Sequence, residues 1–313
     1  MIRIDERFRC MGCDARVRLE SALVPEPELR RTAAAVRAAL ADADRRLTRF
    51  DPGSELSRLN ADPREAVPAS PLVARLARAA LWAGNTSGGL VDATLAGEIE
   101  AAGYAASRTG LAPASLTDAL AAAPPRVLAR PRPEPGFAQI EVLADGRVVR
   151  PPGVRLDSGG LGKGLAADVA AELVPAGVRY AISAGGDLAL GGGEWEVAVT
   201  GAATGAEVHR LRVRSGGVAT SGIHERLWRR EDGTFAHHVL DPSTGEPAWT
   251  GLVAATAAAP GALEAEVLAK TALLSGPAAG RRVLRRHGGV LQHEDGRAEI
   301  VARPPVVRLR IAA

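Results

Sequence analysis

Residues 157–164 read Asp-Ser-Gly-Gly-Leu-Gly-Lys-Gly, a composition typical of a turn that binds an anion. Four glycines within six residues let backbone amides approach a ligand closely. A helix is predicted to follow, so its N-terminus would add partial positive charge to the full charge of Lys163. Asp157 and Lys163 favour this interpretation over a turn that merely needs unusual backbone angles. The turn is not a Walker loop, because Gly164 replaces Ser or Thr, nor a Rossmann fingerprint, because Leu165 replaces the third glycine.

Two later segments contain polar residues beside predicted turns. Gly185-Gly186-Asp187 follows a predicted strand, where a ligand could pass close to the backbone. His238 ends another predicted strand, just before Asp241-Pro242, which is a turn by its chemistry. Paired glycines are common in turns, and a single histidine is more often a structural hydrogen-bonding residue than a ligand. Neither segment alone predicts a function.

Glu266 and Lys270 are four residues apart in a predicted helix, so they lie on one face of it. Two interpretations stay open: a solvated ion pair worth a few tenths of a kcal/mol, roughly, or the charged side of a pocket. Lysine is rare in this chain, because only Lys163 and Lys270 are lysines among 39 Lys and Arg residues. Chance could place both lysines in these segments. A chain that otherwise uses arginine is nevertheless expected to keep lysine where a guanidinium cannot replace a compact ammonium.

Composition limits the classes of function. The 313 residues are 46% hydrophobic, enough to bury the core of one large or two small domains. A net charge of +3 without a basic block argues against a nucleic-acid partner. No stretch is apolar enough to span a bilayer, and no signal peptide is evident, so we expect a cytoplasmic protein or a misassigned start that hides a leader. Cys10 and Cys13 lack a second cysteine pair for zinc; we expect reduced thiols and leave a redox role open.

The predicted elements change character along the chain. Apolar spacing predicts helices at 25–50, 71–84, 93–105 and 262–274, and another from the glycine-rich turn to about Val174. Strands are predicted at 7–20, 180–183, 194–200 and 207–213, and hairpins at Asp145-Gly146, Asp232-Gly233 and Asp295-Gly296. Early helices and late antiparallel strands predict an α+β fold in a single domain over 1–313. The Ala- and Pro-rich residues 111–136 form a possible irregular excursion and the only weak boundary.

The order of these segments resembles the ApbE family of FAD:protein FMN transferases, from about residue 8 to 280. Residues 54–60, Ser-Glu-Leu-Ser-Arg-Leu-Asn, meet one family pattern in full. Residues 157–164 resemble the family's Asp-Leu-Gly-Gly-Ile-Ala-Lys-Gly signature. The other matching segments, in chain order, are Met11-Gly12-Cys13, 91–94, 185–187, 219–222 and 238–245. Seven ordered segments make a specific signal, although several carry substitutions.

The resemblance implies an α+β, T-fold-related domain with largely antiparallel sheets and flanking helices. It implies an enzyme that splits FAD, joins the FMN half to a Ser or Thr hydroxyl of an acceptor flavoprotein, and releases AMP. The residues it places around FAD are Met11, Val91, Asp92, Ala93, Asp157, Lys163, His238 and Val239. Gly160, Gly162 and Glu266 would hold magnesium. We predict Glu266, Lys163 and Asp187 as catalytic residues, with the metal or Glu266 favoured for taking the hydroxyl proton and Asp187 next.

The late helix departs from the family pattern. Relatives carry Asp and Thr as metal ligands where this chain has Glu266 and Lys270. A protonated lysine cannot ligate magnesium, and Thr271 lies about 100° further round the helix. We therefore hypothesise that the Lys270 ammonium occupies the place of one cation, which leaves the need for magnesium open. The alternatives are an FAD-binding protein without transfer activity, an FAD pyrophosphatase that yields free FMN and AMP, and, as the least favoured, a non-catalytic structural domain.

Overall fold

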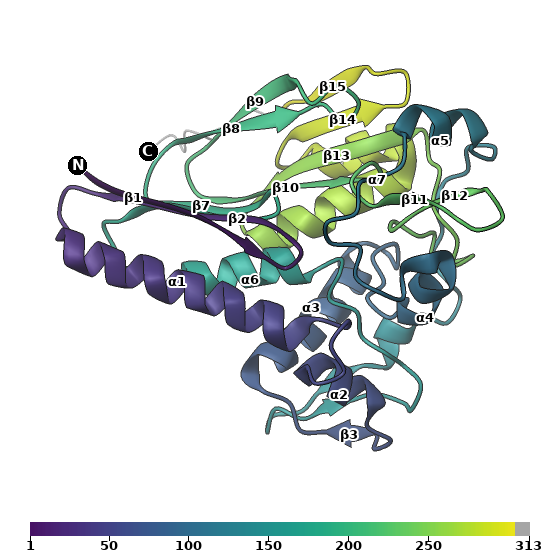
Figure 1. Cartoon of the computed structure of the whole chain (residues 1–313), viewed down its shortest axis with the longest axis horizontal. Coiled ribbons are helices and arrows are strands. Elements are labelled where there is room, and N and C mark those ends of the chain that lie inside the picture. Colours follow the sequence, from purple (N-terminus) through teal and green to yellow (C-terminus); the bar gives the residue numbers. More distant parts are fainter. Residues whose placement is uncertain (304–313) are drawn as a thin grey trace, which may run out of the picture.

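An antiparallel eight-stranded sheet forms the centre of the computed structural model, which describes residues 1–303 (Figure 1). In spatial order its strands are β1 (Ile2–Cys10), β2 (Cys13–Ser21), β6 (Arg179–Ala184), β7 (Asp187–Gly191), β10 (Gly216–Gly222), β13 (Leu252–Ala259), β14 (Gly289–His293) and β15 (Ala298–Val301). Three small antiparallel sheets surround it: β8 (Trp195–Thr200) with β9 (Glu207–Val213), β11 (Leu227–Arg229) with β12 (Phe235–His237), and β3 (Ala66–Val67), β5 (Val148–Val149) and β4 (Glu141–Val142). Helices and antiparallel sheets therefore form the α+β fold that the sequence predicts.

Three helices lie side by side under this sheet: α1 (Glu26–Leu47), α6 (Gly162–Ala171) and α7 (Ala262–Leu284) (Figure 1). The short α6 packs between the other two. The remaining helices are α2 (Glu55–Ala61), α3 (Pro71–Thr86), α4 (Ala96–Ile99), which continues as a π-helical turn over Glu100–Tyr104, α5 (Leu116–Ala122), and a 3₁₀ turn at Gly136–Gln139. This arrangement puts the N-terminus of α6 next to the first turns of α7.

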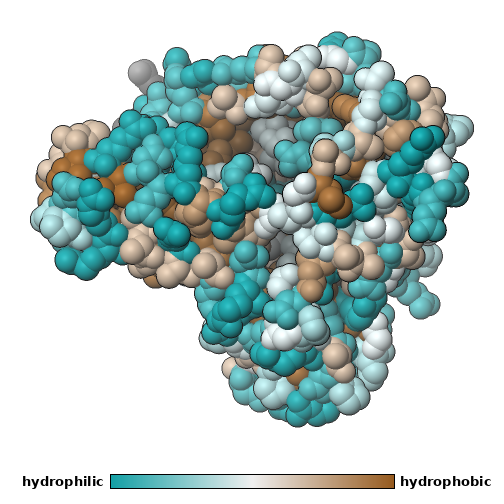
Figure 2. Space-filling model, in the orientation of Figure 1, coloured by the Kyte–Doolittle hydropathy of each residue, from teal (hydrophilic) through white to brown (hydrophobic). Residues whose placement is uncertain are grey.

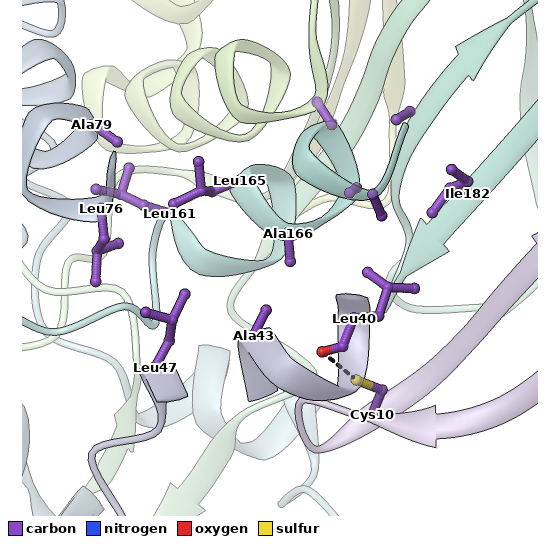
Figure 3. Close-up of a cluster of buried hydrophobic side chains, with 14 of the residues drawn as sticks. Cys10, Leu40, Ala43, Leu47, Leu76, Ala79, Leu161, Leu165, Ala166 and Ile182 are labelled. Atoms are coloured by element: carbon purple, nitrogen blue, oxygen red, sulfur yellow. Dashed lines mark hydrogen bonds between the residues drawn. The ribbon is translucent and has the colours of Figure 1, made fainter. Parts of the chain in front are cut away.

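The main hydrophobic core forms where α1, α3 and α6 meet the sheet (Figure 3). Leu40 and Ala43 of α1 face Ala166 of α6, and Ile182 of β6 closes the cluster (Figure 3). The predicted face of α1 is buried in full: Leu29, Ala33, Val36, Leu40 and Leu47. Acidic residues in the first turn of α1 and arginines in its last turn also suit the helix dipole.

The predicted strand at 7–20 is wrong as a single element, because the chain folds there into the β1–β2 hairpin. Met11 and Gly12 form its two-residue turn with φ values of 52° and 69°. Positive φ at both positions matches the twist of antiparallel strands. Methionine rarely adopts such a conformation, so the turn gives no signal in the sequence.

Other boundaries differ less. The helix predicted at 93–105 begins only at Ala96, and the one predicted at 262–274 continues to Leu284 through a kink at Gly276-Pro277. The three predicted Asp-Gly hairpins are confirmed. Residues 111–136 are largely irregular but contain α5. They also pack on the core, because Val127 N donates to Trp249 O at 3.0 Å and Ala119 is buried. No helix within residues 1–303 is long and apolar enough to cross a membrane.

Candidate functional site

A cavity of about 920 Å³ opens beside the N-terminus of α6. Its walls come from the β1–β2 turn, the end of α1, residues 90–95, the glycine-rich turn, β10, and one face of α7. Figure 2 shows hydrophobic residues recessed between hydrophilic ridges on one face of the molecule. The cavity has the size of a cofactor site and combines apolar walls with a few charged groups.

Asn60 at the end of α2 holds the chain just before the glycine-rich turn. Its side-chain amide donates to Leu156 O at 2.7 Å and accepts from Leu156 N at 2.8 Å. Ser54 caps the N-terminus of α2 by accepting from Ser57 N at 3.0 Å. The segment 54–60, which meets the family pattern in full, therefore fixes the position of Asp157, because Asn60 forms hydrogen bonds with both backbone groups of the preceding residue, Leu156.

The glycine-rich turn and the helix around Glu266 meet directly. Gly164 N donates to Glu266 Oε2 at 2.9 Å. A Cβ atom on Gly164 would lie 2.7 Å from Ala262 O and 2.8 Å from Leu263 Cα, so only glycine allows α6 and α7 to approach this closely. The Asp168 carboxylate of α6 also caps α7, because it accepts from Ala262 N at 2.8 Å and Leu263 N at 2.9 Å.

Lys163 and Asp187 form the first charged pair of the site. Lys163 Nζ lies 2.6 Å from Asp187 Oδ2; the aspartate side chain is 1% exposed and the lysine side chain 29%. Burial raises the pKa of Asp187, although the Lys163 charge opposes it. Burial alone would lower the pKa of Lys163, but the charges of Asp187 and Glu266 outweigh it and raise that pKa. Lys163 therefore stays an ammonium at neutral pH, at the wall of the cavity.

Lys270 and Glu266 form the second pair, which is looser. Lys270 Nζ donates to Gly160 O at 3.0 Å and lies 3.7 Å from Glu266 Oε1. Glu266 Oε1 is buried and accepts no hydrogen bond from any residue within 1–303. Burial lowers the pKa of Lys270, with Glu266 opposing the shift. A buried carboxylate oxygen without a donor is costly unless a ligand satisfies it.

The structure gathers all eight predicted FAD-site residues around this cavity. Those that line it are Met11, Val91, Asp92, Ala93, Asp157, Lys163, His238 and Val239. Glu266 and Gly160 line it as well, whereas Gly162 and Asp187 do not. Asp187 lies behind Lys163 and reaches the cavity only through that ion pair.

Several of these residues also have structural partners. Met11 N donates to Asp44 Oδ2 at 2.8 Å, and Asp157 N donates to Ala93 O at 2.7 Å. Asp92 Oδ1 accepts from Thr94 N at 2.9 Å, so this carboxylate first of all stabilises its own turn. Such contacts fix the backbone that forms the cavity wall.

His238 lies half-buried at the cavity wall, and its Nδ1 has no hydrogen-bond partner among the described residues. Burial, followed by the positive charges of nearby groups including Lys270 and Lys163, lowers its pKa well below the usual value. The imidazole is therefore neutral at physiological pH and can donate or accept a hydrogen bond, but it adds no positive charge.

Arg49 and Arg226 line the same cavity, although neither belongs to a motif that points to it. Arg49 Nε lies 3.3 Å from Asp157 Oδ2, and its guanidinium lies over the ring of Phe50 at 4.2 Å. Arg226 Nη2 donates to Gly12 O at 3.0 Å. In a chain with this many arginines, neither position has a spacing or motif that could have identified it.

The predicted magnesium ligands do not fit a metal as they stand. Gly160 O already accepts from the Lys270 ammonium, Gly162 does not line the cavity, and Thr271 Oγ1 donates to Val267 O at 2.7 Å. Within residues 1–303 no group of three or more His, Cys, Asp and Glu side chains could hold a metal ion. Of the three predicted magnesium ligands, Glu266 keeps an oxygen, Oε1, that accepts no hydrogen bond from the described residues, and the Lys270 ammonium lies 3.7 Å from it.

Comparison with known proteins identifies the relatives of this chain. The model of the ApbE family matches residues 11–292. The FAD:protein FMN transferase of Klebsiella pneumoniae (strain 342) is 29% identical over 280 residues, which are 85% of this chain and 77% of that protein. The protein of the same name from Escherichia coli (strain K12) is 34% identical over 146 residues, 44% of this chain and 41% of the relative. The chain thus matches less than half the length of the Escherichia coli protein.

Solved structures have the same fold. The ApbE protein of Thermotoga maritima MSB8 aligns with a TM-score of 0.79 at 24% identity, over 96% of this chain and 97% of the other. The flavin transferase ApbE from Vibrio cholerae aligns with a TM-score of 0.73 at 18% identity, again over 96% and 97%. The expected fold is therefore confirmed over nearly the whole chain.

Proposed function

The chain belongs to the ApbE family, and from this membership we propose that it is an FAD:protein FMN transferase. The observation that carries the proposal is the contact between the glycine-rich turn and α7, where Gly164 N binds Glu266 at one cavity. This cavity offers the Lys163 ammonium and a Glu266 carboxylate oxygen that accepts no hydrogen bond from the described residues, groups that suit a diphosphate ester and an incoming hydroxyl.

In the proposed reaction an acceptor Ser or Thr hydroxyl oxygen attacks the phosphorus of the FMN half. The bond from that phosphorus to the bridging oxygen breaks, and AMP leaves with the bridging oxygen. Lys163 stabilises the negative charge that develops on the phosphoryl and leaving groups. The products are AMP and FMN joined to the acceptor through a phosphoester.

Glu266 is the proposed acceptor of the hydroxyl proton. Its Oε2 accepts a hydrogen bond from Gly164 N, and no donor in the described part of the chain lies within hydrogen-bond distance of its buried Oε1. Asp187 is less suited to this role, since it is paired with Lys163 and does not line the cavity. A fixed carboxylate with one free oxygen has the geometry that a general base requires.

The test uses the purified chain, FAD and candidate acceptor proteins co-expressed from neighbouring genes. We expect AMP release and an acceptor band with flavin fluorescence after denaturing electrophoresis. Glu266→Gln keeps an oxygen for Gly164 N but cannot take a proton, so this variant should bind FAD and transfer about 100-fold more slowly or worse.

Each alternative gives a different result. Free FMN and AMP without labelled protein would identify an FAD pyrophosphatase. Bound FAD that releases no AMP would identify an FAD-binding protein without transfer activity. Unchanged transfer by Glu266→Gln would exclude Glu266 as the base.

A further inference from the structure

We propose that the Lys270 ammonium takes the place of a divalent cation in this site, so that the diphosphate of the ligand is bound without magnesium. The inference deepens the proposed function and rests on it for the identity of the diphosphate as part of FAD. Lys163 and Lys270, the only lysines of the chain, both line the cavity. Elsewhere the chain uses arginine, so compact ammonium groups are concentrated where a diphosphate would lie.

The position of Lys270 Nζ supports this substitution. The ammonium donates to the backbone carbonyl of Gly160 at 3.0 Å and lies 3.7 Å from Glu266 Oε1. A carbonyl and a carboxylate oxygen are the donors that a hard divalent cation would use. A metal bound to the same Gly160 oxygen would lie within a few ångströms of the ammonium, and like charges at that distance repel strongly.

The ammonium also has bonding capacity left for a ligand. A lysine carries three N–H donors, and among the described residues only Gly160 O accepts one of them. The side chain is 15% exposed, and Lys270 is part of the cavity wall. The two remaining donors can therefore bind phosphate oxygens, as lysines do in other phosphate sites.

The neighbouring threonine does not restore a metal site. Thr271 is buried, and its Oγ1 donates to the backbone of its own helix at Val267 O, 2.7 Å away. Replacing Lys270 by Thr would remove the ammonium and supply a hydroxyl oxygen on the correct face of α7. The chain thus offers a variant that should convert a metal-free site into a metal-dependent one.

The experiment measures binding of FAD by flavin fluorescence and of inorganic pyrophosphate by calorimetry, each with EDTA and with magnesium. We expect the wild-type protein to bind both ligands equally well in the two conditions. Lys270→Met should bind about 10- to 100-fold more weakly in both, because one charged hydrogen-bonding group is lost. Lys270→Thr should bind weakly in EDTA and recover with magnesium.

Thermal unfolding of each variant serves as a control that the fold is kept, and magnesium alone should stabilise only Lys270→Thr. Wild-type protein that needs magnesium to bind pyrophosphate, or Lys270→Met that binds both ligands as the wild type does, overturns the inference. Metal-free binding of pyrophosphate without any binding of FAD would instead overturn the proposed function and leave the role of Lys270 supported. Failure of the wild type to bind either ligand in EDTA overturns the inference as well.

Discussion

Two ion pairs of this molecule have the same length, but the pKa values of their carboxyl groups are shifted in opposite directions. On the β1–β2 hairpin, Arg16 Nη2 lies 2.6 Å from Asp5 Oδ2, and hydrogen bonding to Arg16 lowers the Asp5 pKa to about 2. In the site, Lys163 Nζ also lies 2.6 Å from Asp187 Oδ2, yet burial raises the Asp187 pKa. The Asp5 side chain is 25% exposed and that of Asp187 1%.

This difference shows that burial, and not the distance between the charged atoms, decides whether the pKa of the paired carboxyl group is raised or lowered. Water around Asp5 keeps the carboxylate solvated, so an arginine only adds to its stability as an ion. Around Asp187 that solvation is lost, and one lysine does not fully replace it. Mutation of a buried pair at the cavity should therefore change the free energy of unfolding strongly, and mutation of a surface pair should change it weakly.

The largest effect is expected for Lys163→Met, which leaves Asp187 buried without its cation. Urea unfolding at pH 7 should show a loss of about 3–5 kcal/mol. Because the Asp187 pKa is raised, the penalty should shrink as the pH falls and the carboxyl takes up a proton.

The matched control for this variant is the double substitution Lys163→Met with Asp187→Leu. Removal of both charges should recover most of the lost stability. An equal loss in single and double variants would show that Lys163 acts through its packing, and the contrast between the two pairs would then disappear.

Gly164→Ala tests whether the contact between α6 and α7 holds the buried charges in place. An added Cβ would lie 2.7 Å from Ala262 O, so the helices must separate, and the Gly164–Glu266 hydrogen bond should weaken. We expect a loss of about 1–3 kcal/mol in denaturant unfolding. Gly97→Ala is the control, since a Cβ there meets only Arg155 Nη2 at 3.4 Å. Equal effects of the two substitutions would contradict the close-packing argument.

His237 extends the comparison to a buried group that is neutral. It is fully buried against Trp249, with ring centroids 4.7 Å apart, and burial lowers its pKa to about 3. The unfolded chain takes up this proton near the ordinary value of 6.5, so stability should fall as the pH drops from there towards 3.

The slope expected from one such group is roughly 1.4 kcal/mol per pH unit. His237→Gln should remove that part of the slope when unfolding is measured between pH 7 and about pH 5. His209→Gln on the β8–β9 hairpin controls for the loss of a histidine. An unchanged slope in His237→Gln would show that other groups cause the acid sensitivity.

The smallest effect is expected for Asp5→Asn on the exposed side of the comparison. Its folded pKa is lowered, so its contribution is present above the ordinary value of 3.8 and is lost as the pH falls towards 2. After screening by water we expect a loss below about 1 kcal/mol at pH 7. A loss of stability as large as that of Lys163→Met would contradict the expectation that surface pairs contribute less than the buried pair at the cavity.

The sequence predicted those elements whose apolar spacing or turn residues are distinctive. The amphipathic α1 and the three Asp-Gly hairpins are examples. The strands β7, β10 and β13 were not predicted, although all three lie in the middle of the main sheet. β13 reads Leu-Val-Ala-Ala-Thr-Ala-Ala-Ala and is buried on both faces, so it shows no alternation.

For the candidate site, the sequence predicted which segments contribute residues but not how these residues lie relative to one another. Ordered motifs were sufficient to select Met11, Asp157, His238 and Glu266, and the structure brings these four to one cavity. The same motifs selected Asp187 as a catalytic residue, but Asp187 does not line the cavity and instead pairs with Lys163, which does. Arg49 and Arg226 were missed, because their role depends on neighbours that are distant in sequence.

By itself the sequence determined the glycine-rich turn, the order of the motifs and the concentration of the only two lysines in them. The tertiary structure decided what these residues touch: Glu266 reaches Gly164 across 102 positions, and Lys270 reaches Gly160 across 110. The physical reason is that a missing side chain at Gly164 lets two helices come close enough to exclude water. Burial, which no local pattern encodes, then sets the protonation of the charges between them.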